Sequence, residues 1–365
     1  MRIGIDAHFL SKISQGTGTY SYQLISSLIN KLSEEKLVLL NKDNILDKWT
    51  YTKCLEWGKL FSNYTPFNVF GGYDYIARKC KLDVIHTNYL GSVFPSKFIK
   101  IVTVHDVLFK SHPQFFPKKL QWGINSLTSY SLREADKIIA VSEYTRNQLM
   151  YYYPFLQNKI HVVYEAASKD FYPLSNIMEN KLRCKLGIQK PYILFVGRLA
   201  PMKNIESLIT YFLKNSRIQE EYDLILVGKF DNSFPNQQLK QKIYSTSKIK
   251  LLTGVDNQTL NILYNYATLF YFVSNGEGFG LPILEAMSAG CPVLTSNTTA
   301  CDEIAGNAAL KVSPNSYNEI SDALDLLLSN SSLRAHFSRE GIKHVKNYSW
   351  DNCAEQTLQI YHSYL

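Results

Sequence analysis

The sequence predicts an α/β protein with two Rossmann-like domains, and three observations support that fold class. Its 365 residues exceed the roughly 250 to 300 over which one hydrophobic core usually extends, so two domains are expected. Short apolar runs alternate with helical segments along the chain. The alternation occurs in two successive blocks, and it is typical of parallel sheets that helices cover on both faces.

The first block begins at the N-terminus, where RIGID at residues 2–6 predicts a strand. The segment 19–33, TYSYQLISSLINKLS, predicts the first helix. Further strands of this block are expected at 36–40, 83–87, 101–105, 137–141 and 159–164.

The second block begins after the polar, proline-containing segment 168–181, which predicts the domain boundary. We therefore expect an N-terminal domain over 1–170 and a C-terminal domain over 171–349. The last third of the chain is helical in pattern, most clearly at 316–329. Strands of the second block are expected at 192–197, 223–228, 249–254, 268–273 and 292–296. A ligand is expected in the cleft between the domains, at the carboxyl ends of the strands.

The net charge of +8 is concentrated in the first half of the chain. Residues 1–165 hold 20 Lys and Arg against 13 Asp and Glu, whereas residues 166–365 hold 19 against 18. A basic half can face nucleic acid, an anionic membrane or a phosphorylated substrate, or be an ordinary solvated surface. No nucleic-acid motif or arginine-rich run accompanies it. The segment 109–122, FKSHPQFFPKKLQW, mixes aromatic and basic residues and predicts either an interfacial element on lipid headgroups or a loop and helix start.

The cysteines and the N-terminus favour the cytoplasm. The six cysteines are scattered and form no CxxC pair, so neither a zinc site nor a redox motif is predicted. The stretch MRIGIDAHFL lacks the long apolar region of a secretory signal. No apolar run approaches the roughly 20 residues that span a bilayer.

The segment VGRLAPMKN, residues 196–204, predicts an anion site. Arg198 and Lys203 leave a predicted strand end together, on a loop that enters the next helix. Arginine offers phosphate a planar fork of donors, and lysine offers a point charge. An exposed turn with ordinary basic residues is the alternative for this segment taken alone.

The segment EGFGLPILEAMSAG, residues 277–290, predicts a second part of the same site. Gly280 permits close approach of a ligand to the backbone, and Pro282 suits the first turn of a helix, whose free amides favour phosphate. Glu277 and Glu285 can accept hydrogen bonds from sugar hydroxyls. They could also be the acid and base of a glycosidase, or two unrelated surface acids.

Together these residues resemble the retaining glycosyltransferases of family four, also called glycosyl transferases group 1, whose GT-B fold has two Rossmann-like domains facing across a deep cleft. The match consists of EGFGLPILEA with its E-x7-E pair, GRLAPMKN, the glycine loop QGTGTY at 15–20, VHD at 104–106 and VSEYTRNQL at 141–149. The resemblance spans most of the chain and is closest to bacterial mannosyltransferases of polysaccharide assembly.

The resemblance implies that the C-terminal domain binds a nucleotide-sugar and the N-terminal domain an acceptor. Arg198 and Lys203 would stabilise the departing diphosphate. His105 and Glu277 would support the transferred sugar, and Glu285 would bind the ribose hydroxyls. The other donor-binding positions that it implies are Gly16, Gly18, Val255, Phe279, Gly280 and Leu281. We also expect a C-terminal helix at about 350–365 to pack back on the first domain.

Within that list, the two early glycines would close over the diphosphate, and the backbone amides of 279–281 would face phosphate and sugar. Val255, in the turn TGVDN, would lie by the base. The chain departs from the family pattern at Val273, where the family often has proline, and at 301–304, which replaces a Pro-Glu-Val stretch. The loop before the second domain is also altered, to YEAASKDFYP at 164–173.

The resemblance implies transfer of a hexose to a glycan or lipid-linked glycan in cell-surface polysaccharide synthesis. We expect GDP-mannose as the donor, with UDP-glucose as the alternative. The chain has no Asp-x-Asp, and its two cations can neutralise the diphosphate, so we expect no metal. The expected location is the cytoplasm, with peripheral contact between the basic N-terminal domain and an anionic membrane at its inner face. No nucleic-acid partner is expected.

Three other functions compete with this one. A Rossmann oxidoreductase needs G-x-G-x-x-G after the first strand, and this chain offers only Gly16-Thr17-Gly18. A nucleotide-sugar epimerase or a phosphorylase shares the fold, but the full E-x7-E segment argues against both. A catalytically inactive sugar-binding or scaffold protein would have no need of the phosphate cations.

Overall fold

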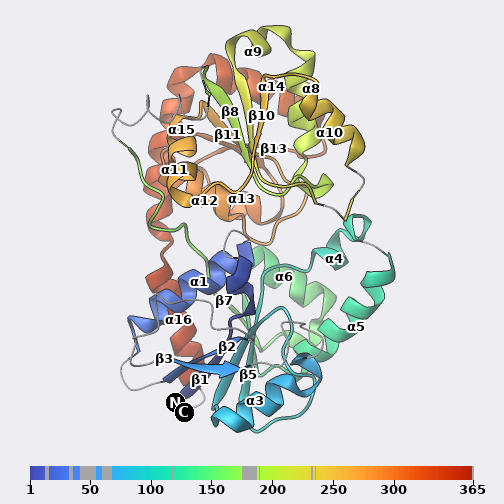
Figure 1. The fold of residues 1–365 in the computed structure, drawn as a ribbon, viewed down its shortest axis with the longest axis vertical. Coiled ribbons are helices and arrows are strands. Elements are labelled where there is room, and N and C mark those ends of the chain that lie inside the picture. The colour runs from blue at the N-terminus through green and yellow to red at the C-terminus, as the bar shows by residue number, and fades with distance from the viewer. Residues whose placement is uncertain are drawn as a thin grey trace. The chain divides into compact units, whose positions relative to one another are not determined.

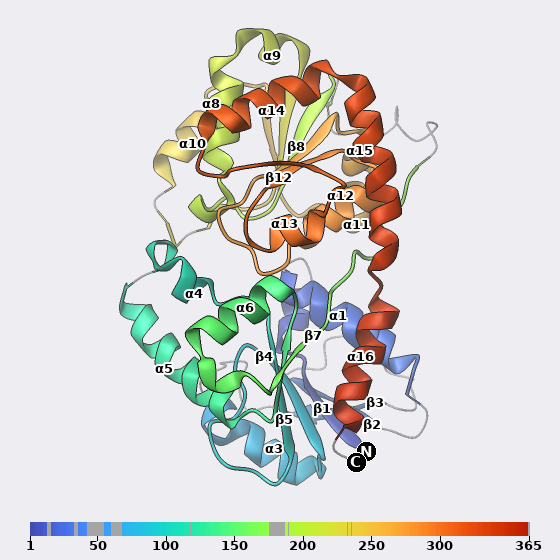
Figure 2. The same ribbon diagram turned by 180° about the vertical axis from the view of Figure 1, so that it is seen from behind.

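The computed structural model describes residues 1–12, 16–32, 36–41, 55–59, 68–116, 118–174, 187–188, 190–231, 233–234 and 236–363, but not the side chains of 11–12, 55–59 and 118–122. The chain forms two compact units: unit 1 is Met1–Glu165 with Ser349–Leu365, and unit 2 is Ala166–Tyr348. Each contains one parallel sheet between helices (Figures 1 and 2). The predicted α/β class with two Rossmann-like units is confirmed.

The sheet of unit 1 has seven parallel strands in the order β3-β2-β1-β4-β5-β6-β7. The strands are β1 (Arg2–Asp6), β2 (Lys36–Asn41), β3 (Leu55–Lys59), β4 (Val84–Asn88), β5 (Ile99–Val104), β6 (Lys137–Ala140) and β7 (Ile160–Val162). Strands are added first on one side of β1 and then on the other, so the chain order reverses between β1 and β4. Such a reversal opens a crevice at the carboxyl ends of the strands.

Unit 1 contains helices from both ends of the chain. Its described α-helices are α1 (Gly16–Ile29), α3 (Tyr73–Cys80), α4 (Leu108–Ser111), α5 (Lys118–Glu134), α6 (Glu143–Tyr152) and α16 (Trp350–His362). Helix α16 packs against α1, as both views show (Figures 1 and 2). The side chain of Ser349 begins α16, because it accepts a hydrogen bond of 3.1 Å from the backbone N–H of Asn352.

A buried chain of hydrogen bonds fastens α16 to the sheet. The hydroxyl of Tyr361 lies 2.6 Å from Nδ1 of His86, and Oγ1 of Thr103 lies 2.7 Å from Nε2 of the same ring. From α1, the Tyr20 hydroxyl lies 2.9 Å from that Thr103 oxygen. Burial lowers the pKa of His86 to about 3, and the neighbouring His105 adds to this effect. His86 is therefore neutral and serves the fold.

The sheet of unit 2 has six parallel strands in the order β10-β9-β8-β11-β12-β13. The strands are β8 (Tyr192–Val196), β9 (Asp223–Val227), β10 (Ile249–Leu252), β11 (Leu269–Phe272), β12 (Val293–Ser296) and β13 (Leu310–Val312). The helices are α8 (Ile205–Lys214), α9 (Ser216–Glu221), α10 (Gln237–Tyr244), α11 (Asn257–Tyr266), α12 (Leu281–Ser288), α13 (Thr299–Ala305), α14 (Tyr317–Ser329) and α15 (Ser331–His344).

Alternate side chains of the unit 2 strands enter two separate cores. Phe195 and Tyr271 belong to the core that contains α8 and α14, whereas Leu194 and Phe270 belong to the core that contains α11 and α12. This alternation follows the two-residue period of a strand. Because both faces are buried, the strands read as continuous apolar runs, which is why the sequence predicts them well.

Some elements differ from the predicted ones. Helix α1 begins at Gly16, so Gly16 and Gly18 lie in a first helical turn, and the predicted glycine loop is wrong over that stretch. Strands β3 and β13 have no counterpart among the predicted strands. Their sequences, LEWGK and LKV, each contain only two apolar residues, and a charged residue separates the two.

The segment 109–122, which mixes aromatic and basic residues, forms most of α4, a short 3-10 helix at Pro113–Phe115 and the start of α5. The side chains of its last five residues, with Lys118 and Lys119, lie outside the described part. Among the described helices, none combines the length and the apolar character that a bilayer span requires.

Two glycines allow the ends of β8 and β9 to approach each other closely. Gly197 and Gly228 have φ of 150° and 154°, which L side chains rarely adopt. A Cβ on Gly228 would lie 1.9 Å from the carbonyl oxygen of Gly197. The N–H of Gly197 donates to Val227 O at 2.9 Å, so the contact fixes where Arg198 leaves the sheet.

Gly228→Ala is expected to lower the free energy of unfolding by about 2–4 kcal/mol, because strained backbone and a backbone clash are combined at one position. Urea denaturation at neutral pH measures it. The matched control is Gly123→Ala in α5, where a Cβ meets no atom within 4 Å. That change should raise stability by about 0.5–1 kcal/mol. Equal stability of Gly228→Ala and wild type would contradict the assigned contact.

Candidate functional site

The candidate site of unit 2 lies where the chain order of its sheet reverses, between β8 and β11, which pair in parallel. Open parallel sheets bind ligands outside the carboxyl ends of the strands at such a point. Arg198 and Lys203 follow β8, and Glu277 follows β11. The fold thus brings three of the predicted site residues to the ends of adjacent strands.

Lys203 and Glu277 form an ion pair in which Nζ contacts Oε1. Their side chains are only 15% and 12% exposed, so water screens the pair weakly. Lys203 Nζ also lies 5.2 Å from the centroid of the Phe272 ring, within range of a cation–π interaction. The backbone N–H of Asn275 donates to Met202 O at 2.8 Å, which joins the two loops that carry the pair.

Arg198 is held much more loosely. Its side chain is 62% exposed, and its Nη1 lies 3.1 Å from Oδ2 of Asp231. Exposed ion pairs of this kind contribute about 0–1 kcal/mol, so the guanidinium can exchange the carboxylate for a phosphate at little cost. Its planar fork of donors suits two phosphate oxygens.

The start of α12 adds backbone donors to the site. Gly280 is the N-cap of this helix and has φ of 102°, a conformation that favours glycine. Pro282 follows in the first turn, and the side chains of Phe279 and Leu281 are buried. The amides of a helix start carry a partial positive charge that favours an anion.

Glu285 differs from Glu277 in its partner and its surroundings. Its Oε2 accepts a hydrogen bond of 3.0 Å from the hydroxyl of Tyr264, on α11. Burial raises the pKa of Glu285 to about 7, although this hydrogen bond acts in the opposite direction. Burial, reinforced by the Glu285 charge, raises the pKa of Tyr264, so the phenol remains the donor. Val255 lies just before α11 and packs against the core that contains Tyr264.

The predicted site residues of unit 1 differ in their exposure to solvent. His105 follows β5 and is 8% exposed. Its Nδ1 lies 3.0 Å from Oε1 of Glu165, and its Nε2 lies 3.0 Å from Oδ1 of Asn88. Gly16 is exposed and Gly18 is buried in the first turn of α1.

Sequence reasoning missed several residues that contact the predicted ones, among them Asn88, Glu165 and Tyr264. Asn88 ends β4, the strand beside β5, so its position at a strand end could have indicated it. Glu165 lies in the altered loop at 164–173. Tyr264 had no local signal, because it contacts Glu285 from another helix.

Within the described ranges, no group of three or more His, Cys, Asp or Glu side chains is arranged to hold a metal ion. Independence from metal stays a prediction. It depends on whether Arg198 and Lys203 suffice to neutralise a diphosphate.

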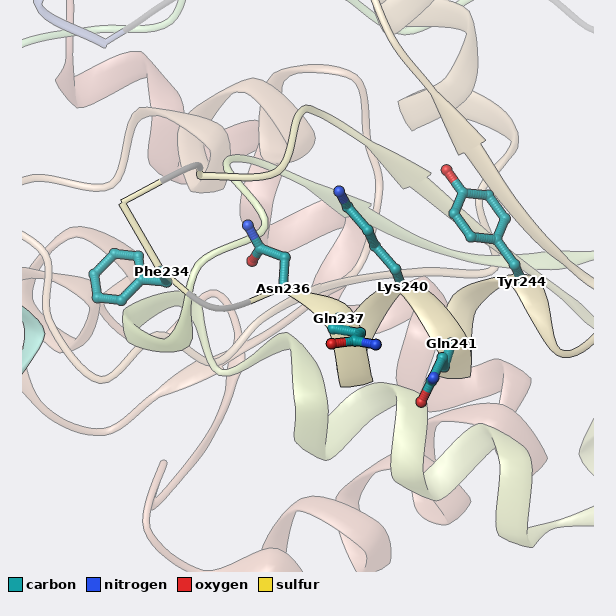
Figure 3. A pocket seen from close by; sticks show the side chains of 6 residues that line it. All are labelled: Phe234, Asn236, Gln237, Lys240, Gln241 and Tyr244. Atoms are coloured by element: carbon teal, nitrogen blue, oxygen red, sulfur yellow. The ribbon is translucent and has the colours of Figure 1, made fainter.

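A pocket of about 540 Å³ lies elsewhere in unit 2, along α10 and the segment before it (Figure 3). Its lining residues are Phe234, Asn236, Gln237, Lys240, Gln241 and Tyr244. None of them is a predicted site residue, and none carries a carboxylate. The charged groups at the ends of β8 and β11 are therefore the better candidate site.

Comparison with known proteins gives two family matches. The family described as Glycosyl transferases group 1 matches residues 178–344, and the family described as Glycosyltransferase Family 4 matches residues 50–169. The chain is 32% identical over 271 residues to O-antigen chain mannosyltransferase B of Escherichia coli. That alignment covers 72% of this chain and 69% of the relative.

Solved structures share the fold. Sucrose-phosphate synthase from Thermosynechococcus elongatus is 20% identical with a TM-score of 0.81, over 99% of this chain and 98% of that one. HepE of Anabaena, in complex with UDP and glucose, is 17% identical with a TM-score of 0.76, over 100% of both chains. At these identities the likeness concerns the fold alone, and it confirms the predicted GT-B class.

Glu285→Gln is expected to remove a pH dependence of stability. The folded pKa of about 7 exceeds the ordinary value of 4.5, so the carboxyl favours folding fully below pH 4.5 and loses that contribution as the pH rises to 7. The loss amounts to at most about 3 kcal/mol. Relative to the variant, wild type should therefore be less stable at pH 8 than at pH 5, as measured by urea denaturation.

A second variant tests whether the pH dependence arises from Glu285. Tyr264→Phe removes the hydrogen bond that lowers the pKa of Glu285, so the loss should extend to higher pH. Parallel stability curves of wild type and Glu285→Gln between pH 5 and 8 would contradict the raised pKa.

Proposed function

Since this chain belongs to the glycosyl transferases of group 1, we propose that it moves a hexose from a nucleotide-sugar to a hydroxyl of a glycan or lipid-linked glycan in cell-surface polysaccharide synthesis. The observation that carries the proposal is the group of Arg198, Lys203 and Glu277 at the reversal point of the unit 2 sheet, ahead of the start of α12. Two cations and a helix start suit a diphosphate, and a carboxylate suits sugar hydroxyls.

Donor binding exchanges one set of charge contacts for another. Lys203 and Glu277 neutralise each other in the structure. With the donor, Lys203 and Arg198 contact the diphosphate, while Glu277 accepts hydrogen bonds from the transferred sugar. A nucleotide without its sugar offers Glu277 no hydroxyl, so separating the buried pair costs more for GDP than for GDP-mannose.

The remaining donor contacts are also divided between carboxylates, which bind hydroxyls, and backbone groups, which face the phosphates. Glu285 accepts hydrogen bonds from the ribose hydroxyls, with its orientation held by Tyr264. The backbone amides of 279–281 face phosphate and sugar, and Val255 lies by the base. Gly16 and Gly18, at the start of α1, close over the diphosphate.

We propose that the reaction retains the anomeric configuration, with attack on the front face of the sugar. The bond between the anomeric carbon and the phosphate oxygen breaks, and the acceptor oxygen bonds to that carbon. The departing phosphate oxygen takes the acceptor's proton, so no protein carboxylate is needed as nucleophile. Arg198 and Lys203 stabilise the charge that develops on the diphosphate. His105 and Glu277 support the sugar.

GDP-mannose is the proposed donor, because the relative with 32% identity is a mannosyltransferase. UDP-glucose is the alternative, since the Anabaena structure of similar fold contains UDP and glucose. The proposed acceptor is a lipid-linked glycan at the inner face of the cytoplasmic membrane. The excess of basic residues in 1–165 suits such a surface.

Thermal unfolding with UDP, GDP, ADP and their sugar conjugates tests the donor site. A ligand at 100 times its Kd should add about 2.7 kcal/mol of stability. GDP and GDP-mannose are expected to stabilise the protein, equally with and without a chelator. Lys203→Ala should weaken GDP-mannose binding about 10–100-fold, because a charge-assisted contact is lost.

The matched control is Lys250→Ala. Lys250 also forms an ion pair, 3.0 Å from Asp223, but at the amino ends of β9 and β10, away from the candidate site. This variant should keep the full shift with GDP-mannose. If no nucleotide stabilises the protein, the proposed donor site is wrong. If a chelator abolishes the stabilisation, binding requires a metal.

Membrane contact is tested by co-sedimentation with vesicles. Lys118→Glu with Lys119→Glu should release the protein from anionic vesicles, since each basic residue near such a surface contributes about 1 kcal/mol. The same charge change at Lys240 and Lys242, on α10 of unit 2, should leave binding intact. If the Lys118/Lys119 variant binds as wild type does, this segment does not contact the membrane.

A further inference from the structure

We propose that Glu165 is a positioning residue that holds the His105 ring as a hydrogen-bond donor to a hydroxyl oxygen of the transferred sugar. This inference rests on the proposed function, in which His105 supports that sugar. It adds a residue from the altered loop at 164–173 to the site. It also assigns His105 a donor role and excludes it as a base.

The first step is the burial of Glu165. Its residue surface is 2% exposed, so its carboxylate has lost almost all contact with water. A buried carboxylate is stable only when a donor or a cation faces it. Nδ1 of His105 lies 3.0 Å from Oε1 of Glu165. Since an ionised carboxylate only accepts hydrogen bonds, this contact assigns a proton to Nδ1.

The second step concerns the other ring nitrogen. Nε2 of His105 lies 3.0 Å from Oδ1 of Asn88, and the amide nitrogen of Asn88 donates to Oγ of Ser21 at 3.3 Å. In this orientation the Asn88 oxygen accepts, so Nε2 also donates. The ring thus offers a second N–H, and among the described residues its partner is a neutral amide. A sugar hydroxyl oxygen can compete for this N–H, whereas a proton-abstracting role would need a bare nitrogen.

The third step is the restraint on ring rotation. Tyr20 meets the His105 ring edge-on, with centroids 4.7 Å apart and an angle of 87°. Tyr89 lies against it at 5.2 Å, and its hydroxyl donates to Asp106 at 3.1 Å. Burial raises the pKa of both phenols, so they stay neutral neighbours. Within the described part of the chain, Glu165 is the charged contact of the ring, and it fixes which nitrogen faces Asn88.

The test compares Glu165→Gln, which keeps an oxygen that accepts from Nδ1, with Glu165→Leu, which keeps the volume and removes the acceptor. Glu165→Leu should lower kcat about 10–100-fold, the worth of one hydrogen bond to a charged group. Glu165→Gln should restore most of that loss. The Kd of GDP, which lacks the sugar that His105 contacts, should stay within about twofold of wild type in both, because the nucleotide contacts are assigned to unit 2.

Ring ¹⁵N spectra of histidine-labelled protein report which ring nitrogen is protonated, and they do not depend on activity. Wild type and Glu165→Gln should show a protonated Nδ1 at His105, assigned by its absence in His105→Ala. Glu165→Leu should shift the proton population toward Nε2 alone. Unchanged ring nitrogens in Glu165→Leu would overturn the proposal.

Two controls separate positioning from folding. Glu134→Leu removes a carboxylate 3.4 Å from Lys100, also in unit 1, and should leave kcat unchanged. The double variant His105→Ala with Glu165→Leu should be no slower than His105→Ala, since Glu165 acts through His105. Additive losses would overturn the proposal. If wild type is inactive with every nucleotide-sugar, the proposed function fails, while the spectra still decide whether Glu165 holds the ring.

Discussion

The parallel pairing of β8 with β11 is the constraint on which the site of unit 2 depends. Parallel strands end at the same edge of a sheet, so this pairing brings together two loops that are far apart in sequence. Lys203 and Glu277 meet although 74 positions separate them. The close approach of Gly197 and Gly228 fixes the first loop, and the hydrogen bond between Asn275 and Met202 joins it to the second.

The two acids of EGFGLPILEA are electrostatically different although they belong to one motif. Glu277 has a lysine as its partner, whereas Glu285 has a neutral phenol and a pKa raised to about 7 by burial. The first therefore suits a position that must remain charged beside cations. The second suits a hydroxyl-binding position whose ionisation is costly without a ligand. Sequence spacing alone cannot show this difference, because it depends on what packs around each carboxyl.

The fold class was predictable because strands buried on both faces are continuous apolar runs, as in YILFVG and DLILVG. Arg198, Lys203 and Glu277 were predictable as a group because each follows such a strand. Strands β3 and β13 were not predictable, because a charged residue interrupts the apolar run in LEWGK and in LKV. The helical start at Gly16 was missed because glycines suggest a loop. The contacts of Glu165 with His105 and of Tyr264 with Glu285 were also missed, because they join residues from separate elements and leave no local pattern.

The return of the chain to unit 1 through α16 has a consequence for biosynthesis. Unit 2 is one continuous stretch, Ala166–Tyr348, inserted into unit 1. A ribosome therefore synthesises all of unit 2 before it makes the helix that unit 1 needs. Until then the face of α1 that receives α16 is uncovered, and His86 lacks the hydroxyl of Tyr361. Unit 1 is thus begun first and completed last. Its apolar surface on α1 stays exposed while the whole of unit 2 is synthesised.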